Sequence, residues 1–148
     1  MNWQELTGQF YCVDVGSRGG FEDLRTLRPS LHVYSLDADA TAPLGAKEFP
    51  SFHHFSLALH SSRGEKDFFL TTHPSMSSLL EFDRGAFARH FGLMRGSAEW
   101  ARGLEPQRKT TIKTETADNF FRSQNLERID FLKLDTQGTE LEILKGAR

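Results

Sequence analysis

The sequence predicts an α/β domain built on a parallel sheet. Two short apolar runs, Phe10–Val15 and Leu31–Leu36, are separated by a glycine turn and by apolar residues at helical spacing. A strand, a helical crossover and a second strand are typical of a parallel sheet, whose crossovers are right-handed. A third run, Ile129–Leu134, is followed by an aspartate, as the second run is. We expect the carboxyl ends of these strands to meet at one edge of the sheet.

Length, composition and charge fit one ordinary domain over residues 1–148. The chain is 38% apolar and 26% charged, a balance that argues against disordered and membrane-spanning proteins. Its 18 Lys and Arg residues against 20 Asp and Glu residues give no support for binding nucleic acid or an anionic membrane. The lone Cys12 and the lack of a secretory leader predict a cytoplasmic protein. No Cys, His and carboxylate spacing predicts a metal site.

The first predicted strand is followed by a glycine turn and a helix that Pro29 ends. The Ala, Thr, Pro and Gly content of residues 39–50 predicts turns or a short irregular helix. Residues 52–59 and 66–71 are then expected to be strands joined by the turn 61–64. A loop of that size is too short for a crossover helix, so the pair is predicted to be an antiparallel hairpin.

The pattern becomes helical from Arg84 onward. Five apolar residues recur at steps of three and four and so share one face, which we expect to pack in the core; they are Phe87, Phe91, Met94, Ala98 and Ala101. Gly92 and Gly96 argue against one unbroken helix. A role for this stripe as a lid over an acceptor molecule is the alternative.

Shorter elements complete the chain. Residues 110–115 alternate weakly and are predicted to form a strand. Thr116 can cap the short helix that follows it. The last predicted strand is followed by a helix over 139–145.

The turn after the first strand carries the first chemical signal. Asp14-Val15-Gly16-Ser17-Arg18-Gly19 resembles a nucleotide-binding glycine loop in which Asp14 replaces the first glycine. Gly16 and Gly19 allow the backbone to approach a ligand closely. A carboxylate at this place repels a pyrophosphate and favours a positively charged ligand such as S-adenosylmethionine. The alternative is a turn that binds no ligand.

Two further aspartates follow strands that end at the same predicted edge. Asp37 has the spacing at which an acidic side chain binds ribose hydroxyls, and Asp135 follows the last strand. Three acidic groups at one edge suit a cation better than an anion. Asp135 is the first candidate for a general base toward a hydroxyl acceptor, with His60 and His73 as weaker ones. For each histidine, an exposed or packing role is the more usual one.

The last block of the chain resembles the signature of the FkbM family methyltransferases. It reads I-D-F-L-K-L-D-T-Q-G-T-E-L-E-I-L-K-G-A over residues 129–147, where the family typically has I-D-F-L-K-I-D-V-E-G-x-E-x-x-V-L-K-G-A. Residues 10–19 resemble its opening F-V-D-V-G-A-N-x-G, and weaker matches fall at 56–59, 77–79 and 116–118. The chain departs at Gln137, where Glu is usual, and at Ala38, where Pro is common.

This resemblance implies a Rossmann-like class I methyltransferase that uses S-adenosylmethionine to methylate a hydroxyl of a sugar or natural-product-like small-molecule acceptor. It also implies site residues: Asp14, Gly16, Ser17 and Gly19 around the methionine part of the cofactor, Asp37 at the ribose, Leu59 and His60 by the adenine, and Asp135 at the transfer cleft. A complete sheet of this class continues beyond the last block, so we expect a C-terminally truncated domain. Its last strand would then be an open edge that permits self-association.

Two other readings remain open. One is a nicotinamide-binding oxidoreductase module, against which Asp14 argues. The other is a truncated or degenerate domain that binds a nucleoside without turnover. Binding of S-adenosylhomocysteine, rather than NADH, would distinguish the first from a methyltransferase.

Overall fold

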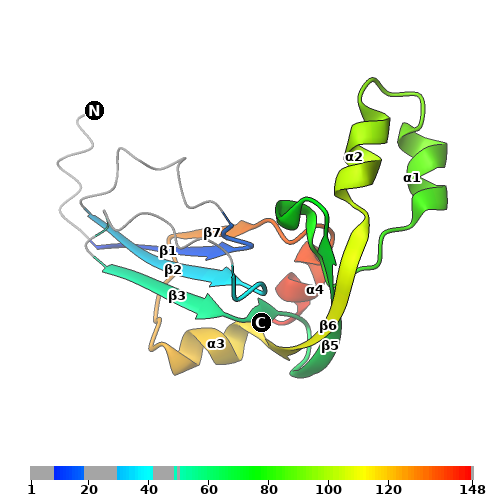
Figure 1. The fold of residues 1–148 in the computed structure, drawn as a ribbon. Coiled ribbons are helices and arrows are strands. Elements are labelled where there is room, and N and C mark those ends of the chain that lie inside the picture. Colours follow the sequence, from blue (N-terminus) through cyan, green and yellow to red (C-terminus); the bar gives the residue numbers. More distant parts are fainter. Residues whose placement is uncertain (1–8, 19–29, 42–48, 50, 148) are drawn as a thin grey trace, which may run out of the picture.

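The computed structural model describes residues 9–18, 30–41, 49 and 51–147, which form two sheets and four α-helices (Figure 1). The larger sheet has four parallel strands in the order β3-β2-β1-β7. Their bounds are Ser51–Ser56 for β3, Leu31–Asp37 for β2, Phe10–Val15 for β1 and Phe131–Leu134 for β7. The predicted α/β class with a parallel sheet is confirmed.

The register of the larger sheet aligns the carboxyl ends of its strands. Val15 of β1 lies opposite Leu36 of β2 on one side and Leu134 of β7 on the other. The loops after these three strands therefore start at one edge of the sheet, as the sequence predicts. Val13, Val15 and Leu36 are fully or almost fully buried, so the core lies directly behind this edge.

Two short helices cover the core at this sheet. Helix α3 (Ala117–Ser123) and helix α4 (Glu140–Lys145) contribute Phe120 and Ile143 to the same buried cluster as Val13. The predicted cap is confirmed, because the Thr116 side chain accepts a hydrogen bond from the backbone N–H of Asn119. Both helices are shorter than an isolated helix needs for stability in water, so their packing on the sheet stabilises them.

The predicted hairpin between residues 52–59 and 66–71 is wrong. The first run breaks at Leu57 into β3 and β4 (Ala58–Leu59), and β4 belongs to the second sheet, whose order is β4-β6-β5. Strand β6 (Pro106–Glu115) lies between β4 and β5 (Gly64–Thr71), parallel to the former and antiparallel to the latter. Strand β5 pairs along its whole length with β6, which is distant in sequence, because the nearby β4 has only 2 residues to offer.

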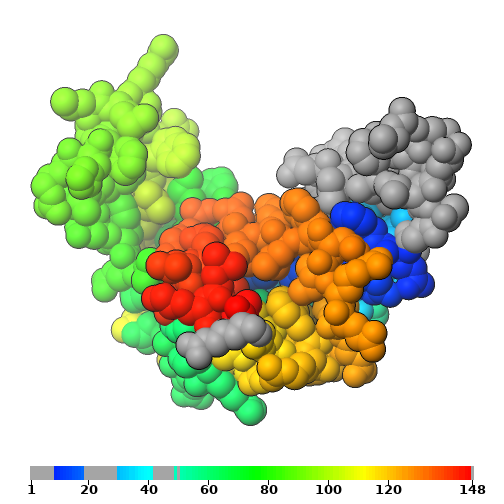
Figure 2. Space-filling model, turned by 180° about the vertical axis from the view of Figure 1, so that it is seen from behind, coloured from blue at the N-terminus to red at the C-terminus, as the bar shows by residue number. Residues whose placement is uncertain are grey.

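The predicted helical stretch forms two helices, α1 (Arg84–Phe91) and α2 (Ser97–Gly103). The break falls between the two glycines, and Gly96 has a left-handed backbone with φ 83°. The helices stand apart from the sheets (Figures 1 and 2). Neither contains a buried residue, so the expectation that the Phe87–Ala101 stripe packs in the core is wrong. These helices project from the end of the β5–β6 ribbon, where no sheet lies beneath them.

Three expectations concern residues outside the described part of the chain: the helix that Pro29 ends, most of the turns over 39–50, and Gly19. Within the described part, no helix has the length and apolar character needed to cross a membrane. The same residues contain no cluster of three or more His, Cys, Asp or Glu side chains suited to a metal ion.

Candidate functional site

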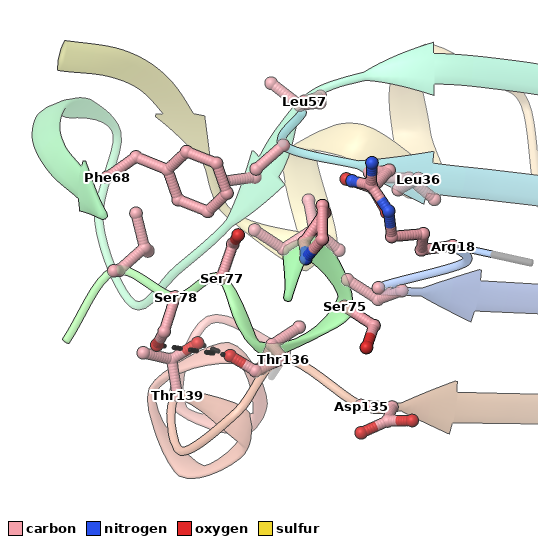
Figure 3. A pocket seen from close by; sticks show the side chains of 18 residues that line it. Arg18, Leu36, Leu57, Phe68, Ser75, Ser77, Ser78, Asp135, Thr136 and Thr139 are labelled. Atoms are coloured by element: carbon pink, nitrogen blue, oxygen red, sulfur yellow. Dashed lines mark hydrogen bonds between the residues drawn. The ribbon is translucent and has the colours of Figure 1, made fainter. Parts of the chain in front are cut away.

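A cleft lies at the carboxyl edge of the larger sheet, between the two sheets (Figure 3). The carboxyl ends of β1, β2 and β7 and the loops that follow them supply one wall, including Gly16, Asp37 and Asp135. The facing wall contains Phe68 of β5 and the segment 74–79, which begins with the short helix η3 (Pro74–Met76). The cleft therefore lies where the sequence predicts ligand binding, at the carboxyl ends of parallel strands.

Gly16 makes the close approach of two of these loops possible. Its backbone is left-handed, with φ 80°, and a Cβ built on it would lie 2.0 Å from the carbonyl oxygen of Asp135. The backbone N–H groups of Gly16 and Ser17 both donate to the carbonyl of Leu36, at 2.9 and 3.1 Å. Hydrogen bonding and close packing therefore hold the three strand-end loops together, and only glycine fits at the centre.

Asp14 lies behind the cleft and forms a buried ion pair. Its side chain is 1% exposed, and the Lys133 Nζ lies 3.0 Å from its Oδ1. Burial raises the pKa of Asp14, although the neighbouring Lys133 ammonium lowers it in part. The three predicted acidic groups therefore do not act as free charges, because Lys133 neutralises one of them and lies 3.8 Å from Asp135. The ion pair follows from the strand register, because Asp14 and Lys133 lie opposite each other in β1 and β7.

Asp37 lines the cleft and keeps hydrogen-bonding capacity. Its Oδ1 accepts a hydrogen bond from the backbone N–H of Asp39 at 2.8 Å, the one bond that its carboxylate makes within the described residues. Arg18 instead binds Asp39, with Nη1 to Oδ2 at 2.6 Å. Burial raises the pKa of Asp37, and the hydrogen bond from Asp39 and the charge of Arg18 oppose this rise. Asp37 is thus a buried carboxylate with an oxygen left for a ligand.

We expect Asp37→Asn to be at least as stable as the parent protein at pH 7. A carboxyl whose pKa is raised by burial destabilises the fold above that pKa and contributes nothing below the unfolded value, where both states are protonated. The advantage of the variant should disappear at about pH 3. Thermal unfolding at both pH values checks this. A variant clearly less stable than the parent at pH 7 would show that the charge stabilises the fold.

Asp135 is the exposed carboxylate of the cleft. Its side chain is 58% exposed, and its Oδ1 accepts a hydrogen bond from the amide Nε2 of Gln137 at 3.2 Å. Gln137 has a left-handed backbone, with φ 59°. Ser75 lies on the facing wall (Figure 3). Asp135 is therefore open to a ligand and is oriented by a neutral donor.

The remaining predicted residues lie in four different settings. Leu59 is buried and lines the cleft. Ser17 is buried behind the lining and accepts a hydrogen bond from the hydroxyl of Ser35 at 2.6 Å. His60 lines a separate depression, and burial lowers its pKa. His73 lies at the start of η3 and is hydrogen-bonded to Ser75 at 2.7 Å. The structure thus brings Gly16, Asp37, Leu59 and Asp135 to one cleft.

Sequence reasoning from single motifs missed the wall formed by residues 74–79. The hydroxyl of Ser78 donates to the carbonyl of Gln137 at 3.0 Å, and it also accepts from the N–H of Leu80. Next to this bond, the hydroxyl of Thr139 donates to that of Thr136 at 2.9 Å (Figure 3). The bonds from Ser78 to the carbonyls of Gln137 and, at 3.4 Å, Thr136 attach the segment after β5 to the loop after β7, although about sixty residues of chain separate them. The weak family resemblance at residues 77–79 falls on this wall but implies no role for its residues.

Comparison with known proteins gives one match. A family model described as the methyltransferase FkbM domain matches residues 14–148. No curated protein and no solved structure shows a significant match. The matched range contains all of the strand-end loops that form the cleft.

Proposed function

The chain belongs to the FkbM methyltransferase domain family, and from that premise we propose that it transfers a methyl group from S-adenosylmethionine to a hydroxyl oxygen. The mainly parallel sheet is the Rossmann-like fold expected of such a methyltransferase. The acceptor that we propose is a sugar or a natural-product-like molecule. The observation that carries this proposal is the buried Asp37 carboxylate, which faces the same cleft as the Gly16 loop and Asp135.

The chemistry of the cleft fits this cofactor. Asp37 can accept hydrogen bonds from ribose hydroxyls through the oxygen that no described residue occupies. Leu36, Leu59 and Phe68 offer apolar surface for a flat adenine ring. Asp135 adds negative charge that suits a cationic ligand.

The described cleft is narrow. Its cavity volume is about 60 Å³, whereas a site for a nucleoside-sized ligand needs a few hundred. Binding of a nucleoside-sized ligand therefore requires the cleft to open wider. The hydrogen bonds from Ser78 to the loop after β7 are the contacts that such an opening would stretch.

The residues of the cleft have distinct roles in this proposal. When bound, the cofactor would supply an electrophilic methyl group on a positively charged sulfur, and the sulfur would keep the electron pair of the carbon–sulfur bond. The Asp135 carboxylate accepts the proton that the acceptor hydroxyl loses. Gln137 holds that carboxylate in place through its amide. The cleft supplies the remaining acceleration by holding the acceptor in line with the methyl carbon.

Calorimetric titration with S-adenosylhomocysteine tests the proposal. We expect the parent protein to bind it and Asp37→Asn to bind at least about tenfold more weakly, because a hydrogen bond to a charged group contributes about 1.5–3 kcal/mol. Asp67→Asn is the matched control, since this carboxylate is 52% exposed on β5 and pairs with Lys109. Titration with NADH examines the oxidoreductase alternative. A folded parent that binds NADH but no S-adenosylhomocysteine would contradict the proposal.

A further inference from the structure

A second cavity lies beside the cleft, against helices α1 and α2. Its volume is about 610 Å³, within the range typical of small-molecule sites. Its wall is mostly apolar and is formed by Met76, Phe87, Phe91, Met94, Trp100 and Leu104. Phe91, Met94 and Trp100 are 49, 59 and 62% exposed. One exposed aromatic residue is ordinary, but several around one cavity indicate a binding surface.

The cavity adjoins the candidate site. Ser75 lines both the cleft and the cavity. Gln137 lines the cavity and donates its hydrogen bond to Asp135, which lines the cleft. A molecule held in the cavity can therefore extend a hydroxyl past Ser75 and Gln137 toward the Asp135 carboxylate.

The charge of the cavity restricts its ligand further. Among the described residues that line it, Arg95 is the one that carries a charge. Within the described part of the chain, the Arg95 guanidinium has neither an ion pair nor a hydrogen bond, whereas Arg84 at the start of α1 is paired with Glu105. An unpaired guanidinium beside apolar surface matches a ligand that carries an anionic group next to an apolar body.

We propose that this cavity is the acceptor site, and that the acceptor is a small hydroxylated molecule with an apolar ring body and an anionic group. The proposal rests on the proposed methyltransferase function and specifies its substrate class. The apolar body packs between Phe91 and Trp100, the anionic group binds Arg95, and the hydroxyl reaches Asp135. Among acceptors of the proposed function, this favours apolar natural-product-like molecules over free sugars.

Fluorescence titration with two matched dyes tests the cavity. The probes are 1-anilinonaphthalene-8-sulfonate, which has an apolar body and a sulfonate, and the uncharged N-phenyl-1-naphthylamine. We expect Phe91→Ala and Trp100→Ala to weaken both dyes by about tenfold, because each removes a large aromatic contact. Arg95→Gln should weaken the sulfonate dye about two- to fivefold and leave the uncharged dye unchanged. Leu93→Ala is the control, since this fully exposed side chain lies between the helices without lining the cavity.

Saturation with S-adenosylhomocysteine and a measurement of molecular mass complete the test. We expect the sulfonate dye to bind equally well when S-adenosylhomocysteine saturates the cleft. An acceptor and a cofactor must bind at the same time, so their sites cannot overlap. If S-adenosylhomocysteine binds but the dyes are insensitive to all three variants, or compete with it, the acceptor proposal fails while the proposed function stands. If the dyes bind as expected but S-adenosylhomocysteine does not, the proposed function fails and the acceptor role fails with it. A dimer that Phe91→Ala or Trp100→Ala dissociates would instead assign the cavity to a second copy of this chain.

Discussion

Gly16→Ala will lower the free energy of unfolding by about 3–5 kcal/mol and abolish binding of S-adenosylhomocysteine. Two effects add at this position. An alanine with φ near 80° has the strain of a left-handed backbone, about 1–2 kcal/mol. In addition, its methyl group would lie 2.0 Å from the Asp135 carbonyl oxygen, which is backbone and cannot rotate away. The loops after β1 and β7 must then separate, and the cleft loses its shape.

Gly96→Ala is the matched control for this prediction. Gly96 also has a left-handed backbone, with φ 83°, but a Cβ there meets no atom within 4 Å. Only the backbone strain remains, so the expected loss is about 1 kcal/mol. Urea unfolding of both variants gives the comparison. Equal losses would mean that the contact with Asp135 contributes nothing and that Gly16 is required only for its backbone conformation.

Lys133→Met will lower the free energy of unfolding at pH 7 by about 2–3 kcal/mol. The substitution keeps most of the apolar stem but leaves the buried Asp14 carboxylate without its ammonium partner. Breaking a fully buried pair costs about 3–5 kcal/mol, and we expect less here because Lys133 is 29% exposed and water can reach the site. Urea unfolding at pH 7 measures the loss.

The pH dependence of the same variant identifies the cause. Burial already raises the pKa of Asp14, and removal of the Lys133 charge raises it further. As the pH falls through this raised pKa, the native state takes up a proton and the uncompensated charge disappears. The variant should therefore recover toward the parent in acid, and the double variant Asp14→Asn/Lys133→Met should recover most of the loss at pH 7. A loss independent of pH would indicate that the stem of Lys133, and not its charge, stabilises the fold.

These two predictions concern the framework of the site, whereas Asp37 and Asp135 face the ligand. Gly16 permits the loops after β1 and β7 to touch, and the ion pair of Asp14 with Lys133 joins the same two strands just behind them. Both features hold the wall from which Asp135 projects. Loss of either should therefore weaken ligand binding together with stability, whereas Asp37→Asn should weaken binding alone.

The sequence by itself predicts the parallel sheet, the cap at Thr116 and the gathering of Gly16, Asp37 and Asp135 at one edge. All of these depend on local information: a short apolar run is a strand, a polar residue before a helix is a cap, and residues that follow parallel strands share an edge. Resemblance to a known family adds the expected cofactor.

The second sheet, the charge partner of Asp14 and the position of the helical pair depend on packing between distant segments. Residues 58–59 and 64–71 are close in sequence, yet β6, from a distant part of the chain, lies between them. The apolar stripe of α1 and α2 has the helical period of a core face but stands away from the sheets, against an open cavity. A periodic pattern shows which residues share a face. What that face contacts depends on strand pairing between distant segments, which no local pattern records.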